Sequence, residues 1–157
     1  MQITTRTWNN YIARLSRLNE AAGQKMREYI RLHGTENTEE LISYAYAVIT
    51  RYGEGSAELA CQMYDALAEA EGMLLPAAEP AATASYGEVA RMVHATKDQN
   101  PENLPSGVSR MVKRAGADTT LHNAVRDGAQ WAWVPNGDTC PFCITLASPG
   151  RPPARSC

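Results

Sequence analysis

Apolar residues recur every three or four positions along the first 72 residues of the chain. Between residues 6 and 32 they form one stripe, made up of Trp8, Tyr11, Ile12, Leu15, Leu18, Ala22, Met26, Tyr29 and Ile30. Charged side chains fill most of the remaining positions, as expected for a helix with one buried face. Gly34 follows the stripe and is placed to end the helix. The pattern therefore predicts a long amphipathic helix over residues 6–32.

A second stripe with the same spacing occupies residues 41–68. Thr35 or Thr38 can cap its start, and Thr38 is favoured because two glutamates follow it and suit the positive end of a helix dipole. The Gly-Glu-Gly-Ser segment at residues 53–56 predicts a break or a bend in the middle. Gly72 predicts the end of this second helix.

The pattern becomes shorter and more interrupted after Gly72. Residues 73–84 are rich in proline and alanine, and the prolines predict a stiff linker rather than a continuous helix. Short helices are expected at residues 85–96, 106–115 and 118–130, because Gly116 interrupts the last apolar stretch. Extended chain is expected after them, leading into a turn.

These patterns predict a mostly α protein, without a strand-rich region or an internal repeat. We expect an elongated helical hairpin or bundle, with a small Cys-x-x-Cys turn-helix near the C-terminus. Four regions follow: a long-helix region (1–72), a Pro/Ala linker (73–84), a short-helix region (85–133), and a Cys-x-x-Cys module with an irregular tail (134–157).

Composition and charge narrow the class of function. Hydrophobic residues make up 44% of the chain, and 15 basic against 17 acidic residues give a net charge of -2. This balance provides no overall electrostatic case for specific nucleic-acid binding or for an anionic membrane. No apolar run is long enough to predict a membrane-spanning helix. The N-terminus lacks a signal-peptide core, so the four cysteines are expected to be thiols or metal ligands in a reducing cytoplasm.

The candidate chemistry is concentrated at Cys140 and Cys143. Two thiols at this spacing form half of a tetrahedral zinc site, whose other ligands would have to come from Cys157, His94 or His122. Cys-Pro-Phe-Cys also has the form of a glutaredoxin active site, but that fold needs a sheet downstream of the motif. The third interpretation is a pair of ordinary reduced thiols.

The remaining candidate residues have structural explanations. Cys61 lies on an apolar helix face and is expected in the core. Trp131 and Trp133 are predicted to form a strand edge that packs on helices, or a contact surface. The basic cluster at residues 110–114 predicts a local charged face. No nucleophile elbow, phosphate loop, His-Glu-x-x-His motif or paired carboxylate pattern occurs, so the sequence predicts a protein that is not an enzyme.

The region around the two thiols is more specific than the Cys-x-x-Cys spacing alone. Its signature consists of Val134, Pro135, Gly137, Thr139, Cys140, Phe142, Cys143, Leu146, Ala147 and Ser148. This signature resembles that of phage minor capsid proteins, the Mu F-like head morphogenesis family. Upstream blocks at residues 63–70, 75–89 and 115–120 also look similar, so the resemblance covers most of residues 40–148.

The resemblance implies a helical, non-catalytic, minor component of the phage or prophage head, associated with the portal. Its implied partners are portal or capsid proteins, with possible self-association, and it would move from the host bacterial cytoplasm into the virion head. The resemblance also implies that Cys140 and Cys143 are the first two zinc ligands. The runner-up hypothesis is a small thiol-disulfide or zinc-dependent protein that uses the same two cysteines.

The chain departs from the family pattern after Ser148. Relatives continue with Arg-Gly, a His-containing stretch and a Cys-x-Cys element, whereas residues 149–157 here are rich in proline and arginine. This departure predicts a truncation or frameshift within the module. The zinc site is therefore expected to be incomplete in this chain.

Overall fold

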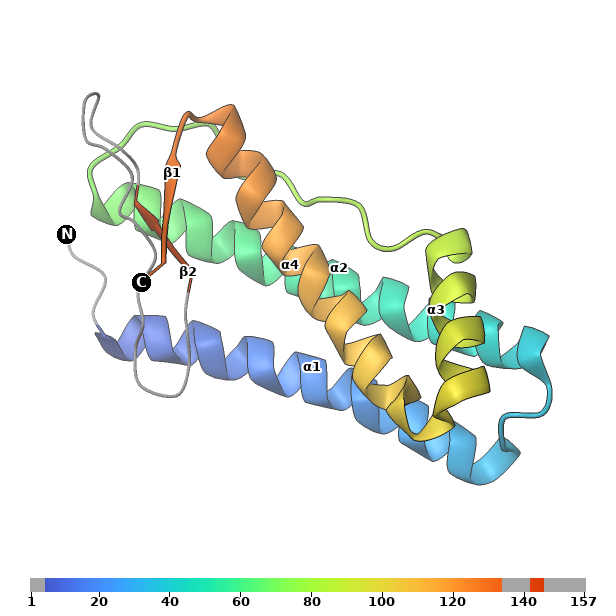
Figure 1. The fold of residues 1–157 in the computed structure, drawn as a ribbon. Coiled ribbons are helices and arrows are strands. Elements are labelled where there is room, and N and C mark those ends of the chain that lie inside the picture. Colours follow the sequence, from blue (N-terminus) through green and yellow to red (C-terminus); the bar gives the residue numbers. More distant parts are fainter. Residues whose placement is uncertain (1–4, 134–141, 146–157) are drawn as a thin grey trace.

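Helices dominate the computed structural model, which describes residues 5–133 and 142–145 (Figure 1). Its elements are α1 (Thr5–His33), α2 (Thr38–Ala70), α3 (Tyr86–Gln99), a short 3-10 helix η1 (Pro101–Asn103), α4 (Leu104–Arg126), β1 (Gln130–Trp133) and β2 (Phe142–Thr145). The predicted mostly α class is confirmed.

Helices α1, α2 and α4 form an elongated bundle, and α3 packs on α2 and α4 (Figure 1). The first two helices form a hairpin, and α4 crosses both of them. All four helices contribute to one hydrophobic core, whose largest fully buried apolar residues are Met26, Leu41, Ile49, Leu104, Val89, Val93, Val108 and Val112. The amphipathic stripes read from the sequence therefore face one another.

The helix ends follow local chemistry. Gly34 and Gly72 adopt φ angles of 70° and 69°, which confirms them as the glycines that end α1 and α2. Asn37, rather than Thr35 or Thr38, caps the start of α2, because its side-chain oxygen accepts a hydrogen bond from a backbone N–H in the first turn. Thr38 is the first helical residue, so the prediction was one position late.

The predicted helix breaks at residues 53–56 and at Gly116 are wrong, because α2 and α4 run through both places without interruption. These glycines instead allow close packing. A Cβ atom on Gly116 would lie 2.6 Å from Ser56 Oγ and 3.2 Å from the Ser56 carbonyl oxygen. A Cβ on Gly55 would lie 3.1 Å from a Leu18 methyl carbon. Glycine is thus required by the approach of a neighbouring helix rather than by a bend.

The C-terminal part of the described chain is a two-stranded antiparallel sheet. β1 pairs with β2 in a register that sets Trp131 opposite Ile144 and Ala132 opposite Cys143. The expected extended chain at residue 131 is confirmed. Phe142–Thr145 of the Cys-x-x-Cys module is a strand, in keeping with its aromatic and β-branched residues, and the rest of the expected turn-helix lies outside the described residues. Cys140 lies outside the described residues.

Candidate functional site

The most organised polar site in the described residues lies beneath the Pro/Ala segment at residues 73–85, called here the extended segment. This segment has no regular secondary structure, and in Figure 1 it runs from the end of α2 back along α4 to the start of α3. Side chains of α2 and of the C-terminal part of α4 bind its backbone; they are Asp65, Thr119, Asn123 and Arg126. The segment is therefore part of the fold and not a free linker.

Asn123 makes the most complete of these contacts. Its Nδ2 donates to the Glu79 carbonyl oxygen at 2.8 Å, and its Oδ1 accepts from the Glu79 N–H at 2.9 Å. One turn earlier, Thr119 Oγ1 accepts from the Ala81 N–H at 3.0 Å. Both side chains are buried, with 2% and 0% of their surface exposed. One face of α4 thus binds two alternate residues of the segment, Glu79 and Ala81, through buried side chains.

Two further side chains hold the start of the segment. Arg126 donates from its two terminal nitrogens to the carbonyl oxygens of Pro76 and Ala77, each at 2.9 Å. Asp65 of α2 accepts from the Ala78 N–H at 2.8 Å. The two prolines of the segment have no N–H to satisfy, and side chains of the bundle accept hydrogen bonds from three of its other N–H groups, those of Ala78, Glu79 and Ala81.

Arg126 is itself positioned by Asp127 and Tyr64. Its Nε and one terminal nitrogen donate to the two Asp127 carboxylate oxygens, each at 2.9 Å. The Tyr64 hydroxyl lies 2.7 Å from Asp127 Oδ2 and 3.1 Å from the Asn123 carbonyl oxygen. Hydrogen bonding from Arg126, with a smaller contribution from Tyr64, lowers the pKa of Asp127 below its usual value. Burial and the Asp127 carboxylate raise the pKa of Tyr64, which keeps its hydroxyl protonated as a donor.

Asp127 should give the fold a specific dependence on acid pH. Because the pKa of Asp127 is lowered in the folded state, its contribution to stability is complete above the ordinary aspartate pKa of about 3.9. The contribution is lost as the pH falls through the lower folded-state pKa. Urea unfolding of wild type and Asp127→Asn should differ at neutral pH and converge in acid. An equal difference at every pH would contradict this role of Asp127.

The described residues contain no comparable arrangement for catalysis or metal binding. No group of three or more His, Cys, Asp or Glu side chains in this part of the chain could hold a metal ion. Cys61 is buried, which confirms its predicted place in the core, and burial raises the pKa of its thiol. A surface depression on α1 is lined by Gln24, Arg27, Glu28 and Arg31, all from the same helix.

Of the residues predicted from the sequence as a site, three lie in paired strands, where Cys143 is opposite Ala132, and Cys140 lies outside the described residues. Cys143 lies in β2 and Trp131 and Trp133 lie in β1, where only the backbone is described. The polar network was missed by the sequence analysis. The signal that could have found it is the spacing of Thr119, Asn123 and Arg126, which places three polar residues on one helix face.

Fold and site together define an α-helical bundle protein in which a long connection is bound to the bundle by side chains. A model of the VG15 protein family matches residues 2–155, so the chain belongs to the VG15 protein family. This is a viral family, and the chain is a phage protein. No curated protein and no solved structure matches it. None of the described helices is both long and apolar enough to cross a membrane.

Proposed function

We propose that this phage protein is a non-catalytic, minor component of the head that acts in head morphogenesis at the portal. Three findings support the proposal: membership of a viral family, the all-α bundle, and the resemblance of residues 134–148 to the Mu F-like signature. The observation that carries most weight is that the polar network at residues 119–127 is occupied by the extended segment. Its side chains bind the protein's own backbone, so the surfaces of the bundle are what the molecule offers to other proteins.

The proposed contact surface on portal or capsid proteins includes the outer side of α4. Leu121 and Val125 lie one turn apart there and are 41% and 69% exposed. Exposed apolar side chains that lie close together on a surface are typical of protein contacts. β1 follows α4 directly and contains Trp131 and Trp133, the residues that the sequence predicts as a contact surface.

The proposal is tested in the phage that encodes the protein. Deletion of the gene should reduce the yield of infectious particles, and mass spectrometry should find a few copies of the protein in purified proheads. Val125→Glu should reduce its incorporation, because a charge would be buried in the contact. Leu32→Glu is the matched control, since Leu32 is 60% exposed on a different helix.

Two results would count against this function. One is the absence of the protein from proheads and virions that otherwise assemble normally. The other is normal head yield after deletion of the gene. Circular dichroism of Val125→Glu and Leu32→Glu shows whether each variant is still folded, so that a lost contact can be distinguished from unfolding.

A further inference from the structure

The charges of this chain are segregated between its two longest helices. α1 contains six basic and two acidic side chains, whereas α2 contains six acidic and one basic side chain. The net charge of -2 for the whole chain conceals this separation. Charge of one sign concentrated on a helix creates a local field that the net value does not report.

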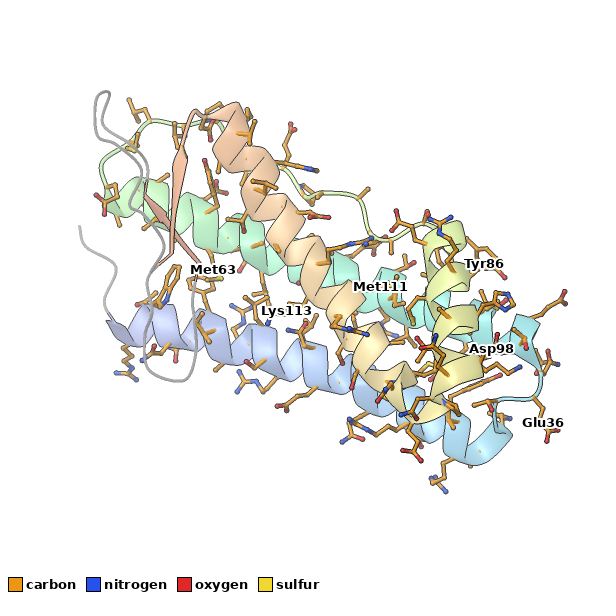
Figure 2. The ribbon with its side chains drawn as sticks, viewed as in Figure 1. Glu36, Met63, Tyr86, Asp98, Met111 and Lys113 are labelled. Atoms are coloured by element: carbon orange, nitrogen blue, oxygen red, sulfur yellow. The ribbon has the colours of Figure 1, made fainter. Side chains whose placement is uncertain are left out.

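The basic side chains of α1 form a stripe on its outer side, called here the basic face. Arg6, Arg17, Arg27 and Arg31 are all exposed and lie opposite the buried Ala22 and Met26. Within the described residues, none of the basic side chains of α1 forms an ion pair. Glu20 and Glu28 share the stripe, so its charge is reduced but remains positive. Figure 2 shows Lys113 of α4 on the side toward α1, so this lysine is not part of the basic face on the outer side of α1.

The outer side of α2 has the opposite character and is called here the acidic face. Glu40, Glu54, Glu58 and Glu69 are exposed along it, and Arg51 is its one basic residue. None of these glutamates forms an ion pair with another described residue. The two faces point away from each other, because the buried sides of α1 and α2 pack together in the core.

We infer that the basic face of one copy of this chain binds the acidic face of a second copy. The charges are complementary, and the two helices have similar lengths of 29 and 33 residues, or about 45–50 Å. Because each copy presents both faces, the contact is heterologous and can repeat to form a ring or an open chain. A polyanion such as DNA fits less well, since the acidic face and the negative net charge would repel it.

The association should be weak and sensitive to salt. Exposed ion pairs contribute little individually, and salt screens them over about 8 Å at physiological ionic strength. Sedimentation velocity should therefore show a mass above the 17.1 kDa of the monomer at about 50 mM salt. At about 500 mM salt the dissociation constant should increase by about tenfold or more.

Charge reversal provides the decisive test. Arg17→Glu with Arg27→Glu makes the basic face acidic, and Glu54→Lys with Glu58→Lys makes the acidic face basic. Each double variant alone should be monomeric, and an equal mixture of the two should associate again, because opposite faces are restored between them. Arg91→Glu with Arg110→Glu is the control, since both arginines are exposed on α3 and α4. Circular dichroism establishes that every variant is folded.

Three outcomes would overturn the inference. The first is a monomer at all concentrations in low salt. The second is association that salt or the double variants leave unchanged, which would place the contact elsewhere. The third is wild type that binds a short DNA duplex through the basic face without associating with itself. The inference does not depend on a role in the phage head, so failure of that proposal would leave it standing.

Discussion

Gly116→Val should destabilise the bundle by about 3 kcal/mol, near the upper end for overpacking a helix contact. Even the first added carbon would lie 2.6 Å from Ser56 Oγ and 3.2 Å from the Ser56 carbonyl oxygen. The hydroxyl can rotate away, but the carbonyl belongs to the backbone of α2. Helices α2 and α4 would therefore have to separate where they cross. Urea unfolding followed by circular dichroism measures the loss.

Gly87→Ala is the control for adding a side chain at a helical glycine that has open space around it. Gly87 is also in a helix, and a Cβ atom there would meet only an Arg91 terminal nitrogen at 3.8 Å. Alanine should leave stability unchanged or raise it by about 0.5 kcal/mol, because it restricts the unfolded chain. Ser56→Gly should recover part of the loss in Gly116→Val by removing the nearer contact. Wild-type stability of Gly116→Val would show that the two helices are not in close contact at this point.

Asn123→Ala should destabilise the protein by about 2–3 kcal/mol. The substitution removes both hydrogen bonds to Glu79 and a third, 2.7 Å long, to the Thr119 carbonyl oxygen. It also leaves the Glu79 N–H and carbonyl without their protein partners. The extended segment should then detach more often from α4, so limited proteolysis within residues 73–85 should be faster than in wild type.

Asn10→Ala is the control, because Asn10 is an exposed asparagine in a helix. It should change the free energy of unfolding by less than about 0.5 kcal/mol. Hydrogen exchange gives an independent measure, since the Glu79 and Ala81 amides should lose protection in Asn123→Ala alone. Unchanged protection would mean that the segment is held by its apolar contacts, such as buried Ala84, rather than by the polar network.

The helices were predictable because the decisive signals are local. The stripe over residues 6–32 and the stripe over residues 41–68 both correspond to helices that bury the predicted face. Ser85 is the observed cap of α3, and its Oγ accepts from the Glu88 N–H as a serine at that position should. Each of these features depends on residues within one or two turns of one another.

The polar site was not predictable in the same way. Asn123 and Glu79 are 44 positions apart, and no sequence motif around either residue indicates that the two are in contact. The sequence drew attention to Cys140 and Cys143, a pair that is recognisable because its members are close in the chain. A buried asparagine can be recognised only when the surface that buries it is known.

The glycines inside the helices also show the difference between what the sequence predicts and what the tertiary structure decides. A glycine inside an apolar helical pattern can mark a bend or a place where another helix approaches, and the local sequence is identical in both cases. Gly116 belongs to the second kind because Ser56, 60 positions earlier, lies against it. The sequence by itself thus determined which main segments are helical, which faces α1 and α2 bury and where these two helices end, because these features depend on neighbours along the chain. Only the tertiary structure decided how closely the helices cross and that the Pro/Ala segment is bound to α4, because both depend on contacts between residues far apart in the chain.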